Sequence, residues 1–192
     1  VAQGKSRVWA LRDKVYSLLN NYPQTSMHLS FTSNHDENSW SGTEFSRMGL
    51  AHEALSLFTF VAPRSLPLIY TGQEIGYDHV FAFFDRDPIR KYAFNEHTER
   101  YTKLARLHRK NSALWAGEGD WTEIRNNAED CLMILVRETV DNRVIAVMNL
   151  SPYTIRAQYN TGIYAGRYQD HFARRTYVLP TLVDELMGPW EY

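Results

Sequence analysis

The sequence predicts an α/β part followed by an all-β part. A strand, a helix and a second strand follow one another between residues 27 and 70. After Asn111 the hydrophobic pattern changes from the helical period to a string of short strands. The length of 192 residues is enough for one large domain, or for two small ones that each have a core. We therefore expect one domain over residues 1–116 and a second over residues 117–192.

A helix opens the α/β part. Its apolar residues recur at helical spacing, and it ends where two asparagines come shortly before Pro23. The helical pattern begins only a few residues after Val1, which is not an initiator residue, so we expect a fragment of a longer protein. The apolar stripe consists of Val8, Leu11, Val15 and Leu18.

The next elements form a strand–helix–strand unit. Alternating apolar residues predict a strand over residues 27–32. Ser41-Gly42-Thr43-Glu44 matches a capping box and starts a helix that runs to about Ala62. The apolar run 66–70 has the length of a strand, with Pro67 near its start. Such crossovers make the two strands parallel, so their carboxyl ends should lie at one edge.

An aromatic connection over residues 77–95 either lines a cleft or packs down on the protein. A further helix is expected from Thr98, as its N-cap. Short strands separated by turn residues then predict an antiparallel sandwich or a small barrel. The expected strands are residues 121–125, 131–138, 143–150, 153–159, 167–172 and 176–179.

Polar residues follow both strands of the α/β part. His35 and Asp36 come directly after the first strand, and Glu74 follows the second. We expect Asp36 and Glu74 to meet at the shared edge, where sheet enzymes keep their chemistry. Two hypotheses fit: a hydrolase that uses this carboxylate pair with His35 assisting, or a binding module. A third reading is that these residue types simply form turns.

The composition of the chain limits the classes of partner that it is expected to bind. The net charge of −1 provides no basic surface for nucleic acid and no polybasic membrane anchor. No apolar run reaches the 18 residues or so of a transmembrane span. Aromatic residues make up 14% of the chain, and such rings suit stacking on sugars. The single cysteine, Cys131, excludes a disulfide framework or a cysteine metal site within the chain, and nothing assigns a compartment.

Three segments resemble the α-amylase family, glycoside hydrolase family 13. Phe31-Thr32-Ser33-Asn34-His35-Asp36 resembles the family's fourth sequence region, and residues 67–74 are similar to its eighth-strand segment. Residues 103–109, together with residues 111–114, resemble its last barrel helix. The resemblance implies the C-terminal portion of a (β/α)8 TIM barrel followed by an antiparallel β-sandwich.

The resemblance also implies a retaining enzyme that cleaves or transfers α-glucosyl units. Asp36 would be the third carboxylate, which grips the sugar and stabilises the transition state, and His35 would bind the same sugar. Asn34, Trp40 and Glu74 would complete the substrate-binding residues, with Asn34 and Glu74 shaping the loops. The family's nucleophile and acid/base carboxylates lie on earlier strands, so we expect the isolated chain to be inactive.

The expected partner is an α-glucan oligosaccharide or polysaccharide. No cofactor or metal site is expected in this chain, although the resemblance allows a calcium ion in the larger enzyme. A noncatalytic glucan-binding or assembly module is the alternative. Unpaired barrel strands also predict self-association.

Overall fold

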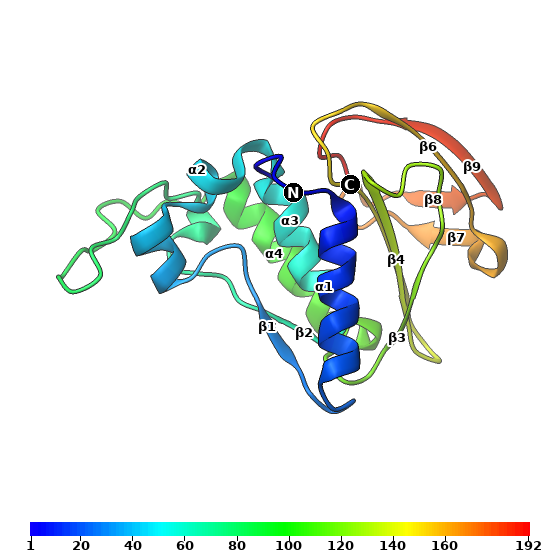
Figure 1. The fold of residues 1–192 in the computed structure, drawn as a ribbon, viewed down its shortest axis with the longest axis horizontal. Coiled ribbons are helices and arrows are strands. Elements are labelled where there is room, and N and C mark those ends of the chain that lie inside the picture. Colours follow the sequence, from blue (N-terminus) through cyan, green and yellow to red (C-terminus); the bar gives the residue numbers. More distant parts are fainter.

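A computed structural model describes all residues, 1–192, and arranges them in layers (Figure 1). Three helices pack on one face of a three-stranded antiparallel sheet, and two strand pairs cover its other face. The helices are α1 (Val8–Asn21), α3 (His52–Val61) and α4 (Glu96–Lys110). The central sheet has the order β3 (Asp120–Glu123), β4 (Leu132–Glu138), β5 (Arg143–Asn149). The outer pairs are β6 (Ile155–Asn160) with β9 (Leu182–Met187), and β7 (Gly166–Gln169) with β8 (Thr176–Leu179).

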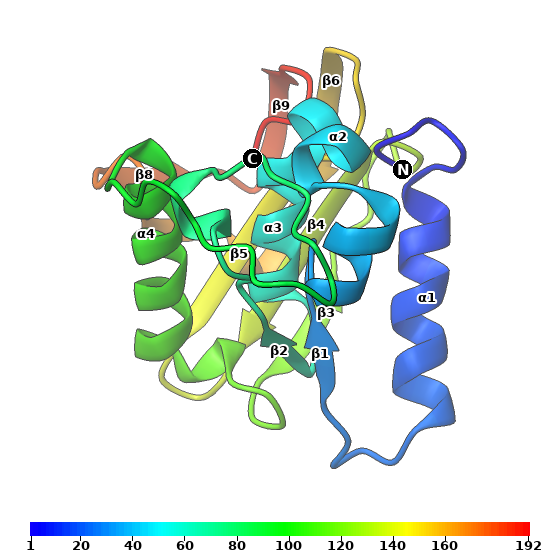
Figure 2. The same ribbon diagram turned by 90° about the vertical axis from the view of Figure 1, so that its left-hand side faces the viewer.

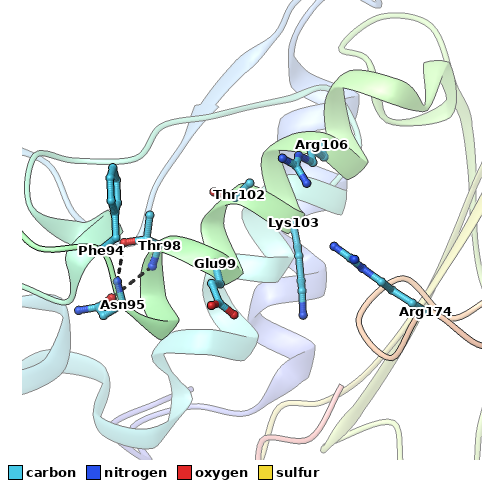
Figure 3. Close-up of a pocket in the computed structure, with 8 residues that line it drawn as sticks. All are labelled: Phe94, Asn95, Thr98, Glu99, Thr102, Lys103, Arg106 and Arg174. Carbon is cyan, nitrogen blue, oxygen red and sulfur yellow. Dashed lines mark hydrogen bonds between the residues drawn. The ribbon is translucent and has the colours of Figure 1, made fainter.

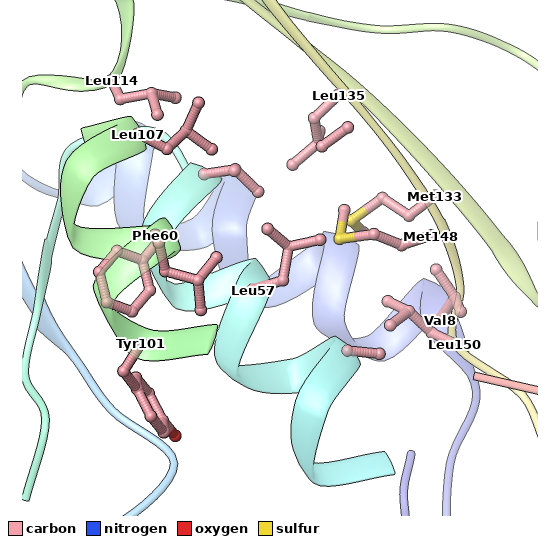
Figure 4. Packing of buried hydrophobic residues seen from close by; sticks show 14 residues of the cluster. Val8, Leu57, Phe60, Tyr101, Leu107, Leu114, Met133, Leu135, Met148 and Leu150 are labelled. Carbon is pink, nitrogen blue, oxygen red and sulfur yellow. The ribbon is translucent and has the colours of Figure 1, made fainter. Parts of the chain in front are cut away.

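Strand β4 joins the two hydrophobic clusters of the molecule. Successive side chains of a strand point to opposite faces. Met133 and Leu135 therefore enter the cluster that contains the helices, while Ile134 and Val136 enter the cluster under the outer strands. Figure 4 shows the first of these clusters, in which Leu57 of α3 lies between Leu107 of α4 and Met133 and Met148 of the sheet.

The α/β part contains the predicted parallel pair. Strand β1 (His28–Ser30) runs parallel to β2 (Ser65–Pro67), with His28 opposite Ser65 and Ser30 opposite Pro67. Both strands are shorter than predicted, and Pro67 ends β2 instead of starting it. Figure 2 shows the pair beneath α3 and beside α1.

The connection between β1 and β2 is a broken helix. It consists of η1 (Glu37–Ser41), α2 (Glu44–Met48), η2 (Gly49–Ala51) and α3. The break follows from Gly49, whose φ of 53° lies in the region that favours glycine. A further short turn, η3 (Gln73–Ile75), follows β2.

Both predicted N-caps are wrong by a few residues. Thr43, not Ser41, caps α2, since its hydroxyl accepts the amide of Ser46 at 3.1 Å. Asn95, not Thr98, caps α4, and Thr98 completes the capping box as its third helical residue. In each case more than one neighbouring residue is of a type that can cap a helix, and the sequence spacing alone does not show which one does.

All six predicted strands of the all-β part are present, with bounds that differ by a few residues. Two short turns lie between these elements: η4 (Ser112–Leu114) between α4 and β3, and η5 (Gly162–Tyr164) between β6 and β7. Strand β9 was not predicted. Asp184 and Glu185 lie in its middle and are disfavoured in strands, but β6 supplies the partner that stabilises it.

The larger hydrophobic cluster contains side chains from both sides of residue 116, so the division into residues 1–116 and 117–192 stays a prediction. Arg137 of β4 also reaches the helical part. Its guanidinium donates to the carbonyls of Val61 and Ala62, at 3.2 and 2.8 Å, at the carboxyl end of α3. No helix in the structure combines the length and the apolar surface that crossing a bilayer would require.

Leu57 should be important for stability because it is only 4% exposed within the shared cluster. We expect Leu57→Ala to lower the free energy of unfolding by about 2–5 kcal/mol, through lost burial and the cavity left behind. Urea unfolding followed by circular dichroism measures this change. Leu50→Ala is the control, because Leu50 is 82% exposed. An equal loss in both variants would contradict the assignment of Leu57 to the core.

Candidate functional site

The loop after β1 exposes a histidine and a carboxylate. Thr32 and Ser33 are buried, and the side-chain oxygen of Asn34 accepts the amide of Glu37 at 2.7 Å, which starts the η1 turn. His35 and Asp36 then point outward, with side chains 67% and 61% exposed and His35 Nε2 3.5 Å from Asp36 Oδ2. The two side chains can therefore reach one ligand together.

Exposed aromatic rings lie beside this pair. The ring of Phe83 is 5.9 Å from that of His35 and 5.3 Å from that of Trp40, between ring centres. Phe84 packs on Phe83 at 4.8 Å. We call Trp40, Phe83 and Phe84 the aromatic shelf. Large aromatic side chains carry much of the binding energy where they contact a partner. The shelf, whose rings are tilted against one another, offers an exposed apolar surface next to Asp36, a hydrogen-bond acceptor.

The aromatic connection is fixed to the site by side-chain amides and carboxylates. Asn38 donates to the carbonyl of His79 at 3.0 Å and accepts the amide of Phe81 at 2.8 Å. Asp87 accepts the amide of Ala82 at 3.0 Å and pairs with His79 at 2.8 Å. The Ala82 amide and then His79 lower the pKa of Asp87. The segment is anchored at Asn38 and Asp87 and places Phe83 against His35. Most of its side chains stay exposed, with Phe84 at 84% and Phe94 at 81%, so the structure shows neither the predicted cleft lining nor a segment that packs down.

A buried polar cluster supports the loop from beneath. Glu44 is 3% exposed, and its Oε2 accepts the Thr32 hydroxyl at 2.7 Å and the side-chain amide of Gln73. Gln73 Oε1 in turn accepts the amide of Tyr70 at 2.9 Å. The cluster thus links the ends of β1 and β2 to α2. Burial raises the pKa of Glu44, against the opposing hydrogen bonds from Thr32 and Gln73.

Sequence reasoning missed this cluster. The sequence predicts a capping box in which the carboxylate of Glu44 reaches back to the amide of Ser41. The available signal was the apolar character of the helix that follows, which indicates that the first turn is covered by other residues.

Glu74 forms hydrogen bonds with residues other than Asp36. Its Oε1 accepts the hydroxyl of Tyr92 at 2.8 Å, and its carbonyl accepts the hydroxyl of Thr98 at 2.8 Å. No hydrogen bond links Asp36 with Glu74, and the ionisable partner of Asp36 is His35, so the structure does not show the expected carboxylate pair. The η3 turn after β2 directs Glu74 towards the start of α4. No group of three or more histidine, cysteine, aspartate or glutamate side chains is placed to hold a metal ion.

The raised pKa of Glu44 makes a pH-dependent prediction. In the unfolded chain this carboxyl loses its proton near its ordinary value of 4.5, whereas the folded protein keeps it to higher pH. The free energy of unfolding should therefore fall as the pH rises above about 4.5 towards the raised value. Glu44→Gln cannot ionise, so relative to wild type it should gain about 1.4 kcal/mol for each unit of elevation.

Urea titrations between pH 4 and pH 8 measure this difference. Glu118→Gln, at an exposed position, is the control. If the difference between Glu44→Gln and wild type does not change with pH, Glu44 is not a carboxyl with a raised pKa.

Comparisons with known proteins place this fold. Residues 121–177 match the family described as the α-amylase C-terminal all-β domain. A noncanonical maltogenic α-amylase from Thermotoga neapolitana is similar over 97% of this chain and 45% of its own, with a TM-score of 0.80 and 17% identity. An α-amylase from Geobacillus thermoleovorans, solved with acarbose, has a TM-score of 0.73 and 16% identity over 96% of this chain and 42% of its own.

A third structure, an α-amylase from Lactobacillus plantarum, has a TM-score of 0.68 and 21% identity over 96% of this chain and 44% of its own. A search of the curated proteins by sequence finds no match. The chain thus spans less than half the length of these similar structures. The predicted resemblance is confirmed at the level of the fold: the chain has the fold of the C-terminal part of α-amylase-family enzymes, and residues 121–177 match that family's C-terminal all-β domain.

Proposed function

We propose that this chain provides the sugar-gripping part of the active site of a retaining α-glucan hydrolase or transglycosidase. The observation that carries the proposal is the exposed His35–Asp36 pair beside the aromatic shelf, at the carboxyl end of a parallel strand. The fold shared with α-amylases supports an α-glucan as the ligand, since the structures similar to this chain include one solved with acarbose.

The barrel assignment is part of the same proposal. β1, the broken helix ending in α3, β2 and α4 follow one another in the order of two successive β/α repeats. In a (β/α)8 barrel the active site lies at the carboxyl ends of the strands, where His35 and Asp36 follow β1. The strands β3 to β9 would then form the β-sandwich that follows the barrel.

Asp36 is suited to bind sugar hydroxyls. An ionised carboxylate accepts several hydrogen bonds, and hydrogen bonds to a sugar 2-hydroxyl strengthen as positive charge develops on the ring. His35, 3.5 Å from Asp36, would hold the same sugar, and Trp40 would stack on a neighbouring one. Asn34 shapes this loop through its bond to Glu37, and Glu74 shapes the next one through Tyr92.

The bond-breaking carboxylates are proposed to lie outside this chain. A retaining mechanism needs two carboxyls about 5–5.5 Å apart, one as nucleophile and one as acid. The neighbouring candidates are each engaged elsewhere: Glu37 pairs with Arg47 at 3.6 Å, Glu44 is buried, and Glu74 binds Tyr92. The proposal therefore assigns no turnover, no cofactor and no metal ligand to this chain; a calcium ion would belong to the larger enzyme.

Calorimetry with maltoheptaose tests the role of Asp36. We expect Asp36→Ala to weaken binding by about tenfold, as for a lost hydrogen bond to a charged group. Asp141→Ala, at an exposed position in the turn between β4 and β5, should leave binding unchanged. If the purified chain hydrolysed starch and Asp36→Ala abolished that hydrolysis, the proposed lack of turnover would be contradicted. Binding that survives Asp36→Ala would instead favour a noncatalytic glucan-binding or assembly module.

Self-association is the second expected property. β1 and β2 pair only with each other, so both outer edges are unpaired, and Leu29 is 60% exposed on β1. We expect light scattering to show concentration-dependent association that Leu29→Lys reduces, because a lysine on an edge strand opposes pairing. Val140→Lys, at a fully exposed turn position, is the control. A stable monomer at all concentrations would show that these edges do not pair.

A further inference from the structure

A polar groove lies on the outer face of α4, apart from the loop that carries Asp36. It has a volume of about 380 Å³ and runs between α4 and the turn formed by residues 170–175. Phe94 lies at the start of the groove, Glu99, Thr102 and Lys103 follow along α4, and Arg106 and Arg174 complete its basic end (Figure 3).

The turn that carries Arg174 is held firmly against α4. The side chain of His171 bonds to the carbonyl of Lys103 at 2.9 Å, and Lys103 Nζ donates to the carbonyl of Phe172 at 3.4 Å. The amide of Arg174 donates to the carbonyl of Asp170 at 2.8 Å, and Arg174 has a φ of 55°. Arg174 therefore projects from a tight turn, and Figure 3 shows its side chain directed towards Lys103.

The groove carries an excess of positive charge. Lys103, Arg106 and Arg174 form no ion pair in the structure, although other arginines of the chain do. Glu99 is the one carboxylate in the lining, which leaves two positive charges in a protein whose net charge is −1. Two arginines and a lysine without carboxylate partners line this end of the groove, and such a set is suited to a phosphate, which arginine can bind in a bidentate manner.

The other end of the groove differs in character. The ring of Phe94 is 81% exposed, and the hydroxyl of Thr102 and the carboxylate of Glu99 lie between it and the cations. Phe94 lies just before Glu96, the first residue of α4, and the helix rises about 10 Å from Glu96 to Lys103. A carboxylate and a hydroxyl can bond to sugar hydroxyls, and an exposed ring can stack on a sugar face.

We propose that this groove binds a phosphorylated sugar. The phosphate lies between Lys103 and Arg174 within reach of Arg106, and the sugar extends along α4 towards Phe94. The proposal does not involve Asp36 or the aromatic shelf, so it can fail or succeed independently of the proposed function.

Calorimetry at low ionic strength with glucose 6-phosphate, inorganic phosphate and glucose tests the proposal. We expect glucose 6-phosphate to bind more tightly than inorganic phosphate, and glucose to show no measurable binding. Arg174→Asn should weaken binding of glucose 6-phosphate by about fivefold, a typical effect of one exposed charge. Asparagine tolerates the left-handed backbone at this position, so the fold should be retained. Phe94→Ala should reduce the affinity for glucose 6-phosphate to that for inorganic phosphate.

Arg109→Gln is the matched control. Arg109 is an exposed arginine of the same helix, but it does not line the groove, so this variant should bind like wild type. The proposal would be overturned if neither glucose 6-phosphate nor inorganic phosphate bound. It would also be overturned if Arg109→Gln and Arg174→Asn lowered the affinity for glucose 6-phosphate equally. Equal affinities for glucose 6-phosphate and inorganic phosphate would overturn the sugar part of it.

Discussion

The burial of β4 on both faces is the constraint on which the rest of the structure depends. Six of its seven residues are buried, with alternate side chains in the two hydrophobic clusters. Both faces of β4 are apolar. If the pairing register of β4 shifted by one residue, Ile134 and Val136 would replace Met133 and Leu135 in the helix-side cluster, and no polar side chain would be buried among these four positions. Arg137 removes this ambiguity. Its guanidinium must meet the carbonyl groups at the end of α3, and burial lowers its pKa to about 10.

The site is positioned by a chain of contacts that begins at this core. α3 packs on β4 and β5, and β2 follows α3 directly and sets the position of β1 beside it. Glu44 and Gln73 then join the residues that follow both strands. His35 and Asp36 have no buried partner of their own, so their positions depend on this polar cluster and on the short η1 turn.

The sequence allowed the order of the elements to be predicted, because hydrophobic periodicity depends on neighbouring residues. The parallel pair and the six strands were found in this way. The errors arose where tertiary contacts decide the outcome. Glu44 is found in the interior because Thr32 and Gln73 supply its hydrogen bonds. β9 forms in spite of Asp184 because Val183 and Met187 of the same strand enter the cluster under the outer strands. His35 and Asp36 were identified as a candidate site by their place after a strand, but the direction of Glu74 depended on a turn that spacing does not describe.

The shared hydrophobic cluster has a consequence for how such a chain can change in evolution. Met133, Leu135 and Met148 of the all-β part pack directly on helices of the α/β part. An all-β part taken from another protein would have to bring a matching set of side chains, and a partner for the carbonyl groups at the end of α3. The two parts are thus expected to be inherited together and to accept substitutions in pairs, unlike modules that are joined by a linker and can be recombined freely.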